Sequence, residues 1–306
     1  MARYIGFRTL RALLTIWIIL TAVFVATRMT GNTIDFLIPE GTDPESRDAM
    51  IEYLGLNLSL LDQYAIYVKS VFSGDFGLSF YERRPVTDMY AERLGPTLAL
   101  YVAAVLLAAG LGVPLGIAAA LKRRSPLGRL IVAVAFLGYA VPNFVLAILM
   151  LLIFSYLLHL LPSAGTGSPW HLVMPTLAVS AALLAAVVRF TRSAMLDVLS
   201  ADYMRTARAK GLDERVVVFK HGLRNALIPV ITVLGLQVTN VMGAAVIIEA
   251  VFAWPGIGEL IVLSTIGRDY PALQFGVLMF AAVVVLVNLA VDVLYALADP
   301  RIRVEA

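Results

Sequence analysis

The sequence DVLSADYMRTARAKGLDERVVVFKHGLRNALIP occupies residues Asp197–Pro229 and is the one long polar, basic interval in the second half of a largely apolar chain. Asp202 is a good helix N-cap, and Gly211 suits the left-handed residue that ends a helix, so a short helix is predicted over Tyr203–Lys210. A second helix is expected to follow, and Pro229 should kink or end it because proline lacks an amide hydrogen and its ring clashes with the preceding turn. We therefore expect a structured helical elbow rather than a plain solvated loop.

One face of the first predicted helix carries Tyr203, Ala207 and Gly211, which are spaced four residues apart. Residues at this spacing are neighbours on a helix surface. The small residues of this face would let the backbone of another protein come close. The elbow is thus predicted to be a docking element.

The composition indicates an integral membrane protein. The chain has 306 residues, of which 60% are hydrophobic, and its mean hydropathy of +0.86 is far above that of a soluble domain. The net charge of +3 could suggest nucleic acid as a partner, but the basic residues are sorted by loop rather than gathered in a patch. The chain has no cysteine, which excludes disulfides, thiol catalysis and cysteine-ligated metals.

About 20 apolar residues cross a bilayer, and runs of this kind predict an all-α, polytopic bundle of six transmembrane helices. A cleaved signal peptide is the alternative for the first run, whose end is rich in small residues; we expect a retained membrane helix. The third run is too long for one straight crossing, so either Pro142 marks a kink or the span is shorter and tilted. The expected spans are Ala12–Thr27, Thr97–Leu121, Leu130–Leu161, His171–Val188, Asn225–Ile248 and Leu273–Leu297.

Loop charge sets the expected orientation, because cytoplasmic loops are enriched in Lys and Arg. The N-terminus, the loop with Lys122–Arg124, the elbow and the C-terminal tail are basic, whereas Thr30–Gly95 holds eleven acidic residues against five basic ones. Both termini and the elbow are therefore predicted to face the cytoplasm. The predicted divisions are residues 1–29 (tail and first helix), 30–96 (extracytoplasmic segment, with helix-like spacing over Leu54–Phe72) and 97–306 (membrane core, including the elbow at 197–229).

Polar residues at membrane depth are costly in hydrocarbon and usually face a cavity or a partner helix. They are candidates for a solute pathway, although a structural hydrogen bond is the alternative for each of them. Asp292 lies close enough to the cytoplasmic end to be interfacial. The candidates are Asn143, Gln237, Asn240, Asn288 and Asp292.

Two further patterns bear on packing. Gly112 and Gly116 form a G-x-x-x-G step suited to close helix contact, either within one bundle or with a second subunit. The interval Glu249–Pro271 has too many Gly and Pro residues for one continuous helix, so we expect a re-entrant or capping turn.

Enzymatic functions are poorly supported, and we expect no catalytic, cofactor or metal site in this chain. It has no G-x-x-x-x-G-K-[ST] phosphate loop and no H-E-x-x-H motif, and His159, His171 and His221 are scattered. An intramembrane protease would need a partner for Asp292, and none is evident. A self-sufficient secondary transporter would need ion-coupling residues and internal repeats, neither of which is seen. A scaffold without transport activity is a further alternative; its mark would be pathway residues that can all be replaced without effect.

The elbow resembles the "EAA" loop of the membrane subunits of binding-protein-dependent ATP-binding-cassette (ABC) importers, most closely the dipeptide/oligopeptide/nickel branch. That branch reads like DYxRTARAKGL, here residues 202–212, followed by HxLRNAxxP, here residues 221–229. Arg205 and Thr206 replace the Glu and first Ala of the general pattern, as is usual in the peptide branch. The segments 74–80 (GDFGLSF), 251–258 (VFAWPGIG) and 268–274 (RDYPALQ) are also similar to this family, with Phe275 where a glycine is more usual.

This resemblance covers nearly the whole chain and implies a type I ABC importer-like permease fold in the bacterial inner membrane, with the elbow as a cytoplasmic coupling helix. It implies three kinds of partner: a second, non-identical permease, two ATPase subunits that bind ATP and Mg, and an external substrate-binding protein. Di- and oligopeptides are the implied substrates, with nickel chelates and glutathione as alternatives. The residues that it assigns to ATPase docking are Asp202, Tyr203, Arg205, Thr206, Ala207, Arg208, Lys210 and Gly211.

Overall fold

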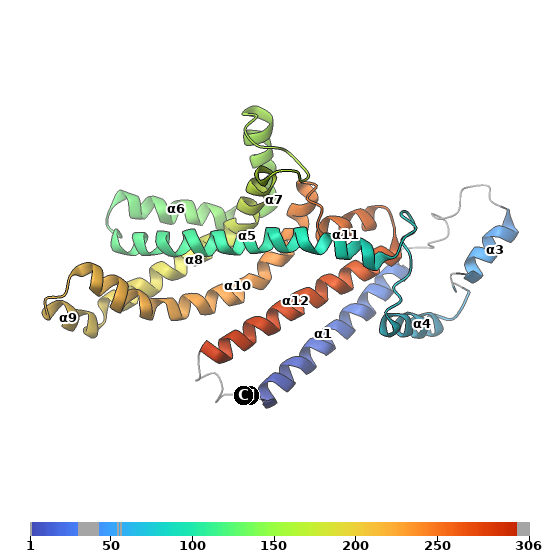
Figure 1. Cartoon of the computed structure of the whole chain (residues 1–306), viewed down its shortest axis with the longest axis horizontal. Coiled ribbons are helices and arrows are strands. Elements are labelled where there is room, and N and C mark those ends of the chain that lie inside the picture. Colours follow the sequence, from blue (N-terminus) through green and yellow to red (C-terminus); the bar gives the residue numbers. More distant parts are fainter. Residues whose placement is uncertain (1, 30–42, 54, 56, 299–306) are drawn as a thin grey trace. The chain divides into compact units, whose positions relative to one another are not determined.

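The computed structural model describes residues 2–29, 43–53, 55 and 57–298 (Figure 1). Within these residues the regular structure is helical apart from one isolated bridge between Leu78 and Pro85, so the predicted all-α class is confirmed. The α-helices are α1 (Ala2–Met29), α3 (Pro44–Tyr53), α4 (Leu60–Ser73), α5 (Val86–Leu121), α6 (Pro126–Ala140), α7 (Asn143–Met150), α8 (Val173–Ser200), α9 (Asp202–Ala209), α10 (Arg224–Val251), α11 (Ile257–Ile266) and α12 (Tyr270–Ala298). Two π-helical segments (Leu151–Leu157 and Val216–Leu223) and a 3-10 turn (Pro169–Leu172) complete them.

Four helices of the described part are long and apolar enough to cross a membrane: Gly6–Met29, Val86–Leu121, Pro169–Ser200 and Tyr270–Val291. A fifth is added if α6 and α7, with the π-helical segment after α7, form one span. In α10 the described apolar stretch is Val241–Val251, which is shorter than a span. The multi-span bundle is thus confirmed, and the count of six stays a prediction.

The predicted kink at Pro142 is confirmed, and the bend there is sharper than a kink within a continuous helix. The helical segments Pro126–Ala140 and Asn143–Leu157 are bent by 104° relative to each other. Val141 has the extended backbone favoured before proline, and Pro142 is the N-cap of α7, with φ −56° and ψ 136°. The run Leu130–Leu161 is therefore a broken or re-entrant pair of helices rather than one tilted span.

Backbone contacts divide the chain into two compact units. Unit 1 comprises residues 1–95 and 256–306, and unit 2 comprises residues 96–255. The helix α5 is continuous across the boundary and contributes to both. These two units are defined by backbone contacts alone. The three segments expected from the sequence are functional divisions, and they stay predictions.

In unit 1, the first long helix packs along the last one. Contacts run between α1 and α12, and the Gln274 side-chain amide donates a hydrogen bond of 2.8 Å to the Thr27 hydroxyl. The helix α4 packs on α1 as well, through a 2.7 Å hydrogen bond between Thr21 and Tyr64. These contacts make α1 part of unit 1, and its retention as a membrane helix stays a prediction.

The hydrophilic segment contains more helix than the sequence analysis predicts. The helix α3 was not expected, and α4 starts at Leu60 rather than near Leu54 because Ser59 caps it, accepting from the Asp62 amide at 3.2 Å. Gly74 ends α4 in the left-handed conformation, with φ 76°. The interval Glu249–Pro271 likewise holds a helix that was not expected, since α11 fits its ten residues between Pro255 and Pro271 and accommodates Gly258.

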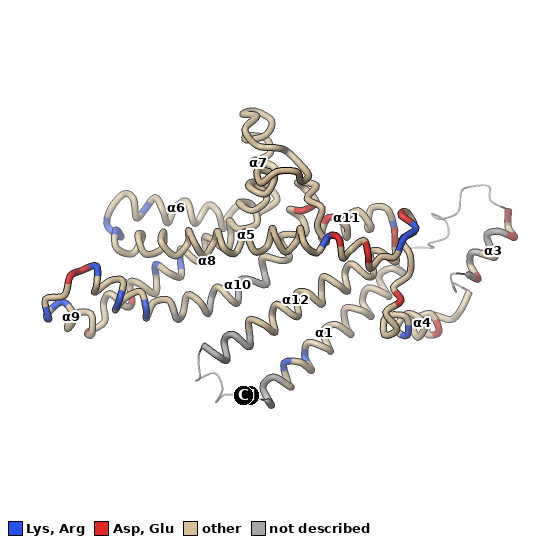
Figure 2. The backbone as a smooth tube through the Cα atoms, viewed as in Figure 1, with Lys and Arg blue, Asp and Glu red and all other residues tan. Residues whose placement is uncertain are grey.

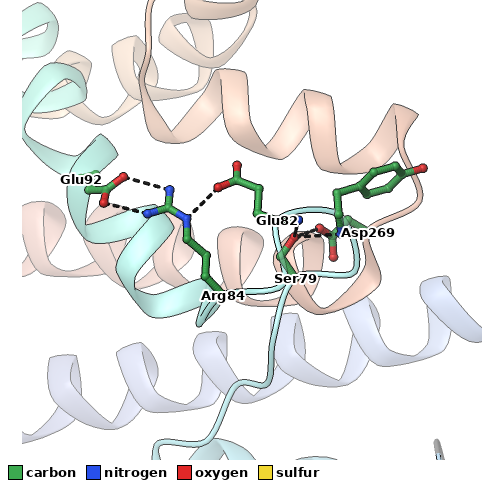
Figure 3. A network of polar contacts seen from close by, with 6 residues as sticks. Ser79, Glu82, Arg84, Glu92 and Asp269 are labelled. Atoms are coloured by element: carbon green, nitrogen blue, oxygen red, sulfur yellow. Dashed lines mark hydrogen bonds and ion pairs between the residues drawn. The ribbon is translucent and has the colours of Figure 1, made fainter.

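A buried polar network fixes the turn before α5 to the turn before α12, both in unit 1 (Figure 3). The Ser79 hydroxyl donates a hydrogen bond to the Asp269 carboxylate, and the Phe80 amide donates to the other oxygen of that carboxylate at 3.2 Å. Next to it, Arg84 donates two hydrogen bonds to Glu92, at 2.8 and 2.9 Å. Two motif segments that are far apart in the sequence, GDFGLSF and RDYPALQ, therefore meet at one point.

In unit 2, the helices α5 and α8 approach each other at the G-x-x-x-G step. A Cβ atom built on Gly112 would lie 2.7 Å from Cγ1 of Val187, and one on Gly116 would lie 2.5 Å from Cβ of Thr191. Only glycine fits at separations this short. The predicted close helix contact is confirmed, and it lies within this chain.

The end of α10 is tied to the middle of α5 within unit 2. The Thr97 hydroxyl donates a hydrogen bond of 2.7 Å to the carboxylate of Glu249, which is buried. The Trp254 indole N–H donates to the carbonyl oxygen of Pro96 at 3.0 Å. These bonds satisfy polar groups that are otherwise costly to bury.

Candidate functional site

The elbow is a folded element with a small hydrophobic core of its own. Met204 and Ala207 of α9 are buried together with Val217 of the following π-helical segment, at 0%, 7% and 0% exposure. Val198 and Leu199, near the end of α8, pack against this cluster. The elbow is thereby held firmly to α8, as predicted for a structured element.

The ends of α9 differ in part from the prediction. Asp202 is the first helical residue rather than the cap, because Ala201 takes the N-cap position and no side chain caps the helix there. Asp202 lies 3.5 Å from Arg205 instead. At the other end Gly211 is left-handed, with φ 76°, as predicted.

An ion pair closes the turn that follows α9. Arg208 donates two hydrogen bonds to the Glu214 carboxylate, from Nε at 3.0 Å and from Nη2 at 2.8 Å. This bonding lowers the pKa of Glu214 and raises that of Arg208. The Asn225 amide also donates to the Tyr203 hydroxyl at 3.1 Å, so both sides of the elbow are braced.

The predicted docking face of Tyr203, Ala207 and Gly211 is wrong in one position. Tyr203 is 43% exposed and Gly211 is exposed, but Ala207 points into the elbow core. The reason is that the apolar side chains of the second helical segment fold back onto α9 and cover this residue. The accessible side of α9 and of the turn after it, called the elbow surface below, carries more basic than acidic residues and consists of Asp202, Tyr203, Arg205, Thr206, Arg208, Lys210 and Gly211.

Pro229 does not end the helix, and the alternative that it kinks the helix stays a prediction. The helix α10 runs from Arg224 to Val251 with Pro229 inside it. The irregular backbone lies about two to four turns earlier, in the π-helical segment Val216–Leu223. A π-helical hydrogen bond spans one residue more than an α-helical one, so the backbone hydrogen-bonding pattern changes just before α10 begins. Such π-helical segments are frequent at functional sites.

The pathway candidates lie on three helices, and their common role stays a prediction. Asn143 is half-buried and opens α7 at the sharp bend, and Gln237 is half-buried on α10. Asn288 is exposed on α12. Asn240 on α10 and Asp292 on α12 have side chains outside the described part.

Sequence reasoning missed Arg189 and Arg192. The predicted fourth span ended at Val188, but α8 continues to Ser200. Both arginines therefore lie inside the long apolar helix Pro169–Ser200. Continuation of the helical pattern through RFTRSAM was the signal that could have revealed them. Among the described residues, no group of three or more His, Cys, Asp or Glu side chains could hold a metal ion.

The described part of the chain combines several helices long and apolar enough to cross a membrane with a folded, hydrophilic elbow. The chain belongs to the family described as "Binding-protein-dependent transport system inner membrane component", whose profile matches residues 112–304. It is 42% identical over 304 residues to the glutathione transport system permease protein GsiC of Escherichia coli K12, covering 99% of each chain. It is 41% identical to GsiC of Shigella flexneri serotype 5b, with the same coverage.

The fold is similar to that of a solved ABC transporter. An inward-facing structure of the MetNI methionine ABC transporter superposes with a TM-score of 0.60 at 18% identity, covering 70% of this chain and 97% of that one. The family expected from the motifs and the type I importer-like fold are therefore confirmed.

Proposed function

We propose that this chain is the permease subunit of an ATP-driven importer that moves small peptides, with glutathione as the leading substrate, into the cytoplasm. Full-length similarity to GsiC supports glutathione, which is itself a peptide and so belongs to the class expected from the motifs. A nickel-chelate importer of the same family is the second candidate. A self-sufficient secondary transporter is disfavoured by the family to which the chain belongs.

The chain is proposed to work with ATPase subunits rather than to hydrolyse ATP itself. It has no G-x-x-x-x-G-K-[ST] phosphate loop. Two cytoplasmic ATPase subunits, which bind ATP and Mg, a second homologous and non-identical permease, and an external binding protein are the partners proposed here. The elbow would be the coupling element between ATP hydrolysis and the membrane helices.

The observation that carries this proposal is the internal bracing of the elbow. Its core of Met204, Ala207 and Val217 and its Arg208–Glu214 pair hold α9 as one body. That body continues into α8 on one side and, through the π-helical segment, into α10 on the other, and α8 and α10 pack against each other. A force on α9 would therefore move the α8–α10 pair together as a rigid body.

The test is an uptake assay with the reconstituted complex. In the variant Arg205→Glu/Lys210→Glu, two exposed charges of the elbow surface are reversed; in the control Arg123→Glu/Arg124→Glu, two exposed charges of another basic loop are reversed. The elbow variant should lose uptake and substrate-stimulated ATP hydrolysis by at least about tenfold, because docking is disturbed while the membrane bundle is intact. The control should stay near wild type.

Normal uptake by the elbow variant would refute the docking role. The substrate is assigned in the same assay, with glutathione, a dipeptide and a nickel–histidine chelate offered separately. Transport of the nickel chelate alone would favour the second candidate. Transport in liposomes by this chain without ATPase subunits would overturn the proposal.

A further inference from the structure

A groove between α6 and α8 combines an apolar lining with two guanidinium groups. Its volume is about 90 Å³, and it lies wholly within unit 2. Val132, Phe136 and Tyr139 line it from α6, and Ala185, Arg189 and Arg192 line it from α8. An apolar groove whose lining includes two positively charged side chains is suited to a ligand that is both anionic and amphiphilic.

The two arginines have no anionic partner among the described residues. The guanidinium carbon of Arg189 lies 5.4 Å from the ring centre of Tyr139 and 5.1 Å from that of Phe190. The Nε atom of Arg192 is buried without a hydrogen-bond partner. Charged groups within membrane helices are costly unless they are paired, so these side chains call for an anion from outside the chain.

The helices α6 and α8 are antiparallel, and the residues that pair between them show how far along the helices the groove lies. A Cβ atom on Gly138 would lie 3.3 Å from the Ala181 carbonyl oxygen, and Ala135 clusters with Ala185. If this pairing is continued along both helices, Arg192 of α8 lies beside the first turn of α6. It also lies eight residues before the end of α8 at Ser200, which is about 12 Å at the helical rise.

Arg192 thus lies toward the basic end of unit 2. The basic loop that precedes α6 lies at the same end of unit 2, where Lys and Arg residues gather on α6, α8 and α9 (Figure 2), and such residues mark the cytoplasmic side. The arginines are therefore near enough to the membrane surface to reach a headgroup while the rest of the groove lies in the acyl region.

We propose that this groove binds an anionic phospholipid of the inner leaflet. Arg189 and Arg192 would hold the phosphate, for which the planar guanidinium is well suited, and the apolar side chains of α6 would line the first part of an acyl chain. Basic pockets between helices at the cytoplasmic side are a recognised form of lipid site. This proposal does not depend on the transported substrate.

The experiment titrates the purified complex, in neutral detergent, with phosphatidylglycerol and follows its thermal unfolding. Wild type should be stabilised by phosphatidylglycerol and not by phosphatidylcholine. Arg189→Gln/Arg192→Gln should need at least about tenfold more phosphatidylglycerol for the same shift. The control Arg123→Gln/Arg124→Gln removes two exposed charges near the same end and should stay within about twofold of wild type.

Soluble glycerol phosphate separates a lipid from a free phosphate. It should give no shift, and a shift at the same concentrations as phosphatidylglycerol would overturn the lipid assignment. A second variant, Val132→Trp, keeps both arginines but fills the groove with a larger side chain. It should also reduce the number of phosphatidylglycerol molecules that the complex retains in native mass spectrometry. Equal retention in wild type and in both groove variants would refute the proposal.

Two other results would also overturn it. If the arginine variant responds normally to phosphatidylglycerol but loses the second permease, the groove is a protein interface. If it responds normally but no longer transports glutathione, the arginines serve the substrate carboxylates. Each outcome is read from a different measurement, so failure of the proposed transport function is distinguishable from failure of the lipid site.

Discussion

Ser79 donates a hydrogen bond to Asp269, which follows it by 190 residues in the sequence, and both side chains are nearly fully buried, at 1% and 3% exposure. The same carboxylate accepts from the Phe80 amide, and the Ser79 oxygen accepts from the amides of Tyr81 and Glu82. The turn before α5 is thus shaped by one acidic residue from a distant part of the chain (Figure 3).

Asp269→Ala should destabilise unit 1, because it leaves the Ser79 hydroxyl and the Phe80 amide buried without an acceptor. Each unsatisfied group costs about 1–3 kcal/mol. Hydrogen exchange should become faster over residues 77–85, and the unfolding temperature should fall. Asp269→Asn keeps an acceptor oxygen in place and should have the smaller effect. Unchanged exchange over residues 77–85 in the alanine variant would contradict this account.

Gly116→Ala should disrupt the α5–α8 contact. The added methyl group would lie 2.5 Å from Cβ of Thr191, and overpacking of this kind costs about 1–3 kcal/mol. Gly110→Ala in the same helix is the matched control, since a Cβ there meets nothing within 4 Å. Its higher helix propensity should leave stability equal or slightly higher. Equal unfolding temperatures for the two variants would argue against the close contact.

Ala207→Glu should unfold the elbow rather than merely prevent docking. The new carboxylate would enter the core with Met204 and Val217, and burial of an unpaired polar group costs at least about 2 kcal/mol. Amide protection over residues 202–209 should be lost in the isolated permease. The exposed variant Arg205→Glu should keep that protection, and if both variants keep it, the elbow core is not required for folding.

The elbow should loosen in acid. Hydrogen bonding from Arg208 lowers the pKa of Glu214 below its usual 4.5, so the folded state favours the ionised carboxylate. The pair therefore contributes fully above about pH 4.5, and its contribution is lost as the pH falls through the lowered pKa. The effect is small, about 0.2–1 kcal/mol, because the pair is exposed.

Amide protection factors over residues 210–215, corrected for intrinsic exchange and measured between pH 6 and pH 3, would detect this loosening. Arg208→Gln should remove the pH dependence, since the glutamine cannot form the ion pair. A similar acid response in Arg208→Gln and in wild type would assign the change to another group.

The sequence was sufficient for the features that depend on local chemistry. Hydropathy indicated the bundle, Gly211 the end of α9, Pro142 the bend, and Gly112 and Gly116 the close packing. Each of these rests on a property of a single residue or a short window. The elbow motif likewise indicated the family, because its residues are contiguous.

Features that depend on tertiary contact could not be predicted in this way. Ala207 looked accessible because helical spacing does not reveal that Val217 folds back over it. Pro229 looked like a helix breaker, but the chain places its irregular backbone earlier, at Val216–Leu223. The fourth span expected from the sequence ends at Val188, before Arg189 and Arg192, because two charges are typical of the end of a span, although α8 continues past both.

Pro142→Ala should make the bend between α6 and α7 less sharp. Alanine restores an amide donor and removes the ring that holds Val141 in an extended conformation. Spin labels at Leu130 and Leu149 would show a longer or broader distance distribution than in wild type, where the two segments are bent by 104°. An unchanged distribution would mean that packing of α7 on α8 fixes the angle.

The pairing of α1 with α12 has a consequence for biosynthesis. Residues are made in order from the N-terminus, so α12, the partner of α1, is made only after all of unit 2. Until then Thr27 has no Gln274 to accept from, and α1 must wait in the lipid while all of unit 2 is inserted and folded. Unit 1 is therefore completed only after unit 2 has been made, and a chain that stops before α12 leaves α1 without its principal neighbour, open to recognition by membrane quality control.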